Sequence, residues 1–256
     1  MQDYPPIILK TSEDGSSTLY RPDLNEHYHS VHGAIQESMH VFIWAGLMFY
    51  FEKNTELESE HFNTPSQLMT KNSSFDPIIN AKNYHSKPIQ ILEVGFGTGL
   101  NALLTLTYSQ NHSIYYHSLE KFPLSKEIIE KINYPQQIPH SKASNWFNEI
   151  HNAQWDQPKQ ITPQFQLFKE HTDLQKFKST HKFDLVYFDA FAPDKQPDLW
   201  TPEIFENIAN IMNSGAILTT YSAKGIVRRA MQKAGLKTEK IPGPPGKREM
   251  LRAIKK

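Results

Sequence analysis

A carboxylate and three glycines stand together at Glu93, Gly95, Gly97 and Gly99, at the end of an apolar run. Glycine is needed where a backbone takes a positive φ or lies close against a ligand. A helix-like pattern follows, and the N-terminus of a helix offers free N–H groups and a partial positive charge. The stretch therefore predicts a buried parallel strand, a tight turn and a helix N-terminus that together hold a ligand.

The spacing of the glycines distinguishes between cofactors. A dinucleotide-binding fold places them as G-x-G-x-x-G, but here the third glycine comes one residue early and Leu100 stands where that fold has glycine or alanine. With Glu93 ahead of the turn, the pattern resembles motif I of class I S-adenosylmethionine (SAM) methyltransferases. The resemblance implies that the turn, including Phe96, Thr98 and Asn101, binds SAM. A flavin or nicotinamide site, or a turn without a ligand, stays open as an alternative.

Carboxylates also stand at or just after three further predicted strands, at Glu120, Asp173 and Asp189. Ligands of open α/β sheets bind outside the carboxyl ends of the strands. We expect Glu120 to accept hydrogen bonds from both ribose hydroxyls of the cofactor, with Lys121 beside it. Asp173 is expected near the adenine ring. The alternative for each acid is a helix N-cap or an exposed turn.

Asp189 opens the loop Asp-Ala-Phe-Ala-Pro-Asp at the predicted position of the methyl acceptor. Methyl transfer is an in-line displacement that depends mainly on positioning. An amine acceptor must be neutral to attack and becomes cationic as it does so, so a carboxylate beside it can orient it, stabilise the charge or take the proton. The sequence therefore predicts Asp189 as the catalytic residue. A structural capping carboxylate is the alternative.

The elements that must position these residues alternate between strand and helix from Pro88 onward, which is typical of an open parallel sheet. The loop Gly243-Pro-Pro-Gly246 joins the last two strands as an antiparallel pair. We predict an α/β fold, a Rossmann-like, doubly wound and mostly parallel sheet of seven strands with an antiparallel terminal hairpin. The strands are expected at 89–94, 113–119, 165–169, 183–188, 216–221, 238–241 and 249–254. Helices are expected at 99–108, 124–132, 142–151, 202–212 and 225–234, the rest of 133–164 being irregular.

Ahead of this domain we predict an N-terminal extension, residues 1–87, and assign 88–256 to the SAM-binding methyltransferase domain. A turn signal at 13–16 between short β patterns predicts a hairpin. Apolar residues near a spacing of 3.6 predict a helix over 33–51. Residues 52–88 are polar and rich in loops, with one short helix expected at 65–71.

The overall charge is zero, with 27 basic and 27 acidic residues, but its distribution is uneven. Residues 224–256 contain eleven basic residues and two acids. Such a basic face fits a phosphate-bearing partner; a solvated helix and tail is the plainer alternative. There is no cysteine, and the histidines lack a regular metal-ligand spacing, so no metal is expected. No signal peptide is visible and the longest apolar run has 11 residues, too few to span a membrane, so a cytoplasmic protein is expected.

Several segments resemble one family more closely. They are Glu93–Asn101, Leu119–Leu124, Phe188–Pro202, Thr220–Arg229 and Gly246–Leu251. They are similar to the tRNA 5-methylaminomethyl-2-thiouridine methyltransferases, MnmD or the methyltransferase half of bifunctional MnmC. The resemblance implies that SAM methylates the exocyclic amine of 5-aminomethyl-(2-thio)uridine at the tRNA wobble position, with Asp189 at the amine. The bifunctional relatives continue into a flavin-dependent oxidase domain, which we do not expect in this chain, so another enzyme would supply the aminomethyl substrate.

The same resemblance implies a set of substrate contacts. An anticodon stem-loop offers phosphates to four basic residues, and aromatic side chains suit a splayed-out base. The residues are Tyr28, Glu37, Phe191, Trp200, Arg228, Arg229, Lys247 and Arg248. The N-terminal motif departs from the family pattern, with His29 in place of a phenylalanine and Ser38 in place of a threonine. The alternative functions are a methyltransferase for a small amine or a protein, and a SAM-fold binding protein without catalysis.

Overall fold

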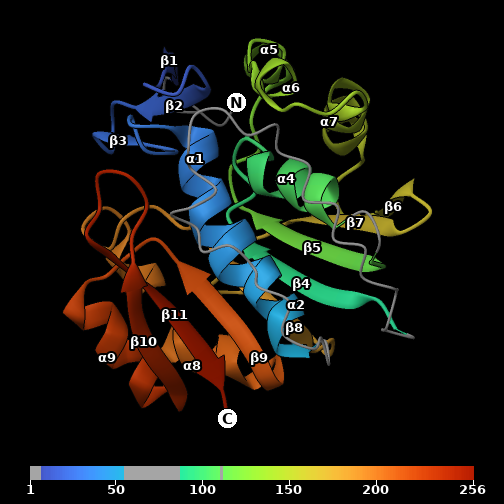
Figure 1. Ribbon diagram of the computed structural model, residues 1–256. Coiled ribbons are helices and arrows are strands. Elements are labelled where there is room, and N and C mark those ends of the chain that lie inside the picture. The colour runs from blue at the N-terminus through green and yellow to red at the C-terminus, as the bar shows by residue number, and fades with distance from the viewer. Residues whose placement is uncertain (1–6, 55–86, 110–111) are drawn as a thin grey trace.

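A computed structural model of the chain describes residues 7–54, 87–109 and 112–256. Within these ranges, eight strands form a central sheet in the order β10-β11-β9-β8-β4-β5-β7-β6 (Figure 1). The bounds are β4 Ile89–Val94, β5 Ile114–Glu120, β6 Pro158–Thr162, β7 Phe165–His171, β8 Phe183–Phe188, β9 Met212–Thr220, β10 Leu236–Pro242 and β11 Glu249–Lys255. Strands β4, β5, β7, β8 and β9 pair in parallel, while β10 and β11 form an antiparallel hairpin. The predicted doubly wound α/β fold is confirmed.

All seven predicted strands are present, and the sheet has an additional edge strand, β6, which pairs antiparallel with β7. The sequence analysis placed this segment in an irregular stretch. Its side chains are exposed or half-buried, and it begins at Pro158, so neither an apolar alternation nor an uninterrupted β pattern marks it. Proline is tolerated on an edge strand because no ladder partner needs its missing N–H there.

The five helices expected in the sheet domain are present with shifted ends, and two further short helices, α6 and η2, were not predicted. They are α4 Leu100–Tyr108, α5 Lys126–Ile129, α6 Tyr134–Gln137, α7 Ala143–Asn152, the short 3₁₀ helix η2 Pro197–Leu199, α8 Pro202–Asn210 and α9 Gly225–Lys233. The predicted helix at 202–212 stops earlier, because Met212 already begins β9. The short helix expected at 65–71 lies outside the described residues.

The N-terminal region contains the predicted hairpin and helix. Strands β1 Ile8–Thr11, β2 Ser17–Arg21 and β3 Glu26–His27 form a small antiparallel sheet. The helix comprises α1 Ala34–Ser38, η1 Met39–Met48 and α2 Phe49–Asn54, and η1 has π-helical geometry. The sequence did not reveal this wider turn, because η1 is apolar on most sides and an apolar spacing near 3.6 indicates a helix without showing which backbone hydrogen bonds it makes. Among the helices described, none is long and apolar enough to cross a membrane.

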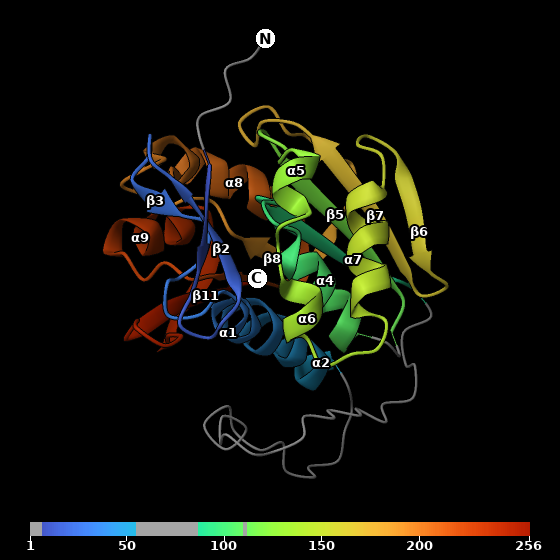
Figure 2. The ribbon, with the colours of Figure 1, turned by 90° about the horizontal axis from the view of Figure 1, so that it is seen from above.

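Helices cover both faces of the sheet and bury a separate core on each (Figure 2). On one face η1, α4 and α7 pack against residues such as Ile91 and Leu185, which alternate along their strands with side chains of the other face. On that other face α8 and α9 pack against Leu92 and Val186. Because the helix of the N-terminal region belongs to the first core, it is integrated with the sheet. The predicted boundary after residue 87 stays a prediction.

The topology creates one crevice at the carboxyl edge of the sheet. Strand β4 pairs in parallel with β5 on one side and with β8 on the other. Later strands are therefore added first on one side of β4 and then on the other, and β4 is the point where the strand order reverses. Ligands bind outside the carboxyl ends of the strands at such a switch point. The N-terminal sheet is attached nearby: the Ser17 N–H donates to Asn133 Oδ1 at 2.7 Å, and Asn133 Nδ2 donates to the Gly15 carbonyl at 2.9 Å.

The burial of the π-helical segment gives a test of its role in stability. Ile43 in η1 is 1% exposed, whereas Ile226 in α9 is 61% exposed. We expect Ile43→Ala to lower the free energy of unfolding by about 2–5 kcal/mol because it leaves a cavity. The matched Ile226→Ala should change it by less than about 0.5 kcal/mol. Urea denaturation measures both, and equal effects would contradict the packing described here.

Candidate active site

The glycine turn between β4 and α4 has the backbone that its glycines permit. Gly95 has φ +91° and Gly97 has φ +49°, backbone angles that residues with a side chain rarely adopt. A Cβ on Gly95 would lie 2.7 Å from the Asp189 carbonyl oxygen, and one on Gly97 would lie 3.1 Å from Cδ1 of Tyr28. The first two glycines therefore admit two neighbours closely: the loop after β8 and the N-terminal segment after β3.

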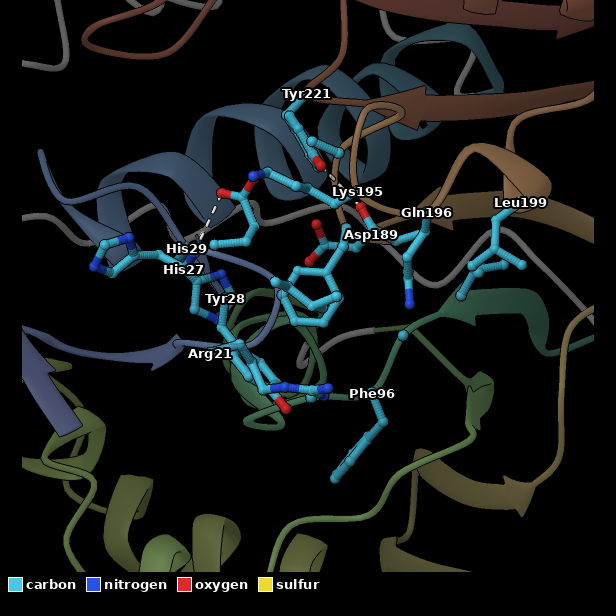
Figure 3. A pocket seen from close by; sticks show the side chains of 18 of the residues that line it. Arg21, His27, Tyr28, His29, Phe96, Asp189, Lys195, Gln196, Leu199 and Tyr221 are labelled. Atoms are coloured by element: carbon cyan, nitrogen blue, oxygen red, sulfur yellow. Dashed lines mark hydrogen bonds between the residues drawn. The ribbon is translucent and has the colours of Figure 1, made fainter. Parts of the chain in front are cut away.

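A cavity of about 750 Å³ opens beside this turn, at the carboxyl ends of β4, β5 and β8 (Figure 3). Its volume lies within the usual range for small-molecule sites. Twelve of the residues predicted from the sequence line it: Tyr28, Glu37, Gly95, Phe96, Gly97, Asn101, Glu120, Lys121, Asp173, Asp189, Phe191 and Lys247. In the described part of the chain, no group of three His, Asp or Glu side chains is arranged to hold a metal ion.

Glu120 is fixed at one end of the cavity by backbone groups. Its Oε2 accepts from the Gly97 N–H at 2.9 Å, and its Oε1 accepts from the Phe122 N–H at 2.8 Å. Each carboxylate oxygen has a second lone pair, so the side chain can still accept a hydrogen bond from a ligand hydroxyl. Next to it, Lys121 Nζ lies 2.7 Å from Asp173 Oδ2. These three side chains and the glycine turn fit the ribose and adenine end of SAM.

Asp189 occupies the centre of the site, where β8 ends. Asn101 in the first turn of α4 donates its Nδ2 to Asp189 Oδ2 at 2.9 Å. Burial raises the pKa of the Asp189 carboxyl to about 7; the nearby Glu37 adds to this shift, while the Asn101 hydrogen bond and the Lys247 charge oppose it. The group is therefore poised to exchange a proton near neutral pH, as a general base should be.

Three residues of the predicted cofactor site, one in β4 and two in the turn itself, are not part of the cavity lining. Glu93 is fully buried and accepts a hydrogen bond from Ser118 Oγ at 2.5 Å. Burial raises the pKa of Glu93 to about 8, with the Asp189 charge adding to the shift. Thr98 and Gly99 are likewise absent from the lining. Their direct contact with a cofactor stays a prediction, and the structure gives them the role of shaping the turn.

Thr98 explains the departure from the family motif at His29. The Nε2 atom of His29 lies 2.9 Å from Thr98 Oγ1, and the Tyr134 hydroxyl donates to the same oxygen at 3.1 Å. Burial lowers the pKa of His29 to about 4, so the imidazole is neutral at physiological pH. In this chain a histidine therefore attaches the N-terminal segment to the glycine turn by a polar contact.

Aromatic side chains line the cavity next to the glycine turn and the loop after β8. The rings of Tyr28 and Phe191 meet edge to face at 5.0 Å. Trp200 was predicted to line the pocket, but it is 3% exposed and donates its Nε1 to the Phe191 carbonyl at 2.8 Å. Trp200 therefore lies outside the cavity lining and holds the backbone of the loop that carries Phe191.

Sequence reasoning missed two residues of this wall. Arg21 lines the cavity with its guanidinium carbon 6.0 Å from the Phe191 ring centroid, and Tyr221 donates its hydroxyl to the Ala190 carbonyl at 2.8 Å (Figure 3). Arg21 ends β2 of the small sheet, where no motif marks it. Tyr221 lies in a segment that resembles the family, which was the one available signal.

The four basic residues predicted to bind phosphate differ in their relation to the cavity and in their exposure. Lys247 lines the cavity. Arg228 is half-buried in α9, while Arg229 and Arg248 are exposed. None of these three arginines is part of the cavity lining.

The contact between Gly95 and Asp189 provides a test of the turn. In Gly95→Ala the new Cβ meets a backbone carbonyl, so we expect a loss of more than about 2 kcal/mol of stability and at least about tenfold weaker SAM binding. Gly235→Ala is the control, because Gly235 has φ +80° but nothing within 4 Å. It should cost about 1 kcal/mol and leave SAM affinity unchanged. Calorimetric titration with SAM would contradict this account if both variants bound equally well.

Comparisons with known proteins agree with this geometry. Residues 133–256 match the model of a family described as S-adenosyl-L-methionine-dependent methyltransferase. The tRNA 5-methylaminomethyl-2-thiouridine biosynthesis bifunctional protein MnmC of Leptospira interrogans is 34% identical over 169 residues, covering 63% of this chain and 26% of that protein. The protein of the same name from Burkholderia thailandensis is 28% identical over 261 residues, covering 96% and 34%.

The fold has a counterpart in the crystal structure of MNMC2 from Aquifex aeolicus. The TM-score is 0.73 at 22% identity, over 100% of this chain and 72% of that chain, and this likeness supports the fold. The chain spans about a quarter to a third of the length of the two curated relatives. With the glycine turn, the cavity and the strand order, these findings show a methyltransferase-type α/β fold in a chain that is similar in sequence to S-adenosyl-L-methionine-dependent methyltransferases and to the MnmC proteins.

Proposed function

We propose that this enzyme transfers the methyl group of SAM to the exocyclic amine of 5-aminomethyl-(2-thio)uridine at the wobble position of tRNA. The product is 5-methylaminomethyl-(2-thio)uridine. The observation that carries the proposal is the position of Asp189, a carboxylate in the cavity wall whose backbone touches the glycine turn. The name of the MnmC relatives supports the choice of substrate.

The residues at one end of the cavity are those that would hold the cofactor. When bound, SAM supplies an electrophilic methyl group on a positively charged sulfur. The turn at Gly95 and Gly97 would border it, Glu120 would accept hydrogen bonds from the ribose hydroxyls, and Lys121 with Asp173 would border the adenine. Asn101 holds Asp189 from the side of α4.

Asp189 is the proposed base and orienting group for the acceptor. The substrate amine attacks with its lone pair, forms the new N–C bond, and carries an extra proton and a positive charge. A carboxylate next to it stabilises this charge and can accept the proton. Because the pKa of Asp189 lies near 7, the ionised form is available under physiological conditions.

The proposed partner is the anticodon stem-loop of a tRNA, with the wobble base splayed out. Recognition of single-stranded RNA commonly uses stacking on aromatic and arginine side chains, and Tyr28, Phe191 and Arg21 provide them beside Asp189. Arg229 and Arg248 are exposed cations for the phosphates. We further propose that the enzyme acts in the cytoplasm, where this tRNA is found, and that residues 1–87 form an extension of the SAM-binding domain 88–256.

The substrate is tested by incubating the enzyme and SAM with tRNA that bears 5-aminomethyluridine. Nucleoside mass spectrometry should show the mass of one added methylene group on that nucleoside. Binding to the tRNA should weaken steeply with salt, since phosphate contacts release counterions. Methylation of a small amine or a protein with no change in the tRNA would favour the alternative function and overturn this one.

The role of Asp189 is tested with Asp189→Asn, which we expect to lower kcat by at least about a hundredfold while SAM binding is largely kept. Asp194→Asn is the control: it lies in the same loop, its side chain is 72% exposed, and its activity should stay near wild type. Loss of both activity and SAM binding in Asp189→Asn would instead assign Asp189 to the cofactor site.

Because the pKa of Asp189 is raised, we expect a rise in pH to increase activity and to decrease the contribution of this residue to stability. The kcat/KM of the wild type should rise with pH through about 7, as the carboxyl ionises. The folded protein holds this proton more tightly than the unfolded chain, whose pKa is near 3.8, so the contribution of Asp189 to stability falls between these pH values. Relative to wild type, Asp189→Asn should therefore become more stable as pH rises; a difference that is independent of pH would contradict the raised pKa.

A further inference from the structure

Three segments that are distant in the sequence meet on one side of the cavity. They contribute Glu37 from α1, Tyr221 from the end of β9, and Lys247 from the loop between β10 and β11. Lys247 Nζ donates to Glu37 Oε1 at 2.7 Å and lies 4.0 Å from the centroid of the Tyr221 ring. The sequence analysis expected Lys247 to contact phosphate, yet its ammonium group is directed to a carboxylate and an aromatic face.

Two members of this cluster are held in place, and the third can leave. Glu37 is 9% exposed in its side chain, and its second oxygen accepts from the Ser30 N–H at 2.7 Å. Tyr221 is anchored through its hydroxyl to the carbonyl of Ala190, the residue next to Asp189. Lys247 has a flexible side chain that is 35% exposed and extends from a loop. It can therefore move away without disturbing the other two.

A fixed carboxylate beside an aromatic face is a binding site for an alkylammonium ion. Lys247 ends in a primary ammonium on a methylene group. An aminomethyl group on a pyrimidine, in its protonated form, ends in the same two atoms. The site is therefore already filled by an ammonium of the chemistry that the substrate carries.

We propose that Glu37 and Tyr221 form a subsite for the primary ammonium group of the acceptor, and that Lys247 occupies this subsite until the substrate displaces it. This inference rests on the proposed function and adds the means by which the amine is selected. A neutral substrate group of the same size would displace Lys247 less readily, because it would leave Glu37 without a counter-ion in a largely buried position.

The charges around Asp189 agree with such an exchange. Glu37 raises the pKa of Asp189 and Lys247 lowers it, so both act on the catalytic carboxylate from nearby. Removal of the Lys247 cation alone would leave two carboxylates facing one cavity. Replacement of one ammonium by another keeps the charge balance and brings the substrate amine beside Asp189. Asp189 takes the proton that frees the lone pair of the amine, and this proton passes to solvent before Asp189 accepts a second one from the methylated product.

The test compares two anticodon stem-loops, one with 5-aminomethyluridine and one with the neutral 5-hydroxymethyluridine. For wild type and Lys247→Met, the ratio of the two Kd values is measured by fluorescence anisotropy. Removal of the competing ammonium should raise the preference for the aminomethyl loop by roughly two- to tenfold. The control is Arg248→Met, a basic neighbour that is exposed. It should weaken both loops equally and leave the ratio unchanged.

A second variant removes the carboxylate of the subsite and leaves Lys247 in place. Glu37→Gln removes the fixed carboxylate and should bring the ratio close to one, while thermal unfolding shows whether the variant is folded. Lys247 would be a phosphate contact if Lys247→Met weakened both loops equally, as Arg248→Met does, and the inference would be overturned. An unchanged ratio in Lys247→Met would overturn it as well. If the wild type fails to methylate the aminomethyl loop, it is the proposed function that fails.

Discussion

The close approach of Gly95 and Asp189 is the contact on which the rest of the site depends. The Asp189 N–H donates to the Val94 carbonyl at 3.0 Å, and the Asp189 carbonyl lies where a Cβ of residue 95 would be. Both residues lie at the point where two parallel strands end side by side. The glycine turn and Asp189, the proposed base, are therefore attached through backbone atoms, and their relative position does not depend on flexible side chains.

Burial is the second constraint, and it acts on carboxylates in different ways. Glu93 lies under the turn and Asp189 faces the cavity, yet burial raises the pKa of both, to about 8 and about 7. Glu120, by contrast, is stabilised by two backbone N–H groups. Carboxylates at the ends of neighbouring strands thus have different chemistry because their hydrogen-bond donors and solvent access differ. A sequence shows that acids stand at strand ends, but it does not show which of them are shielded from water.

Much of the cofactor end could be predicted because local spacing determines it. The glycine turn, Glu120 and Asp189 lie at strand ends, and strand ends follow from apolar runs. The acceptor wall was less predictable, because Arg21 and Tyr221 reach it from a small separate sheet and from the far side of β8. Such placement depends on packing between distant segments. The strand β6 was missed because it is polar on most sides and has no alternating pattern. The helix containing η1 was predicted, but its π-helical geometry was not, because a segment that is apolar on most sides does not show its turn width.

The N-terminal segment joins the two ends of the reaction site. Tyr28 packs on Gly97, His29 contacts Thr98, and Glu37 binds Lys247. This segment lies outside the central α/β sheet that carries the glycine turn. The cavity nevertheless also takes Asp189, Phe191 and Lys247 from the sheet domain. Because Tyr28 and His29 pack on the glycine turn itself, a substitution in this segment that reshapes one end of the cavity also acts on the other.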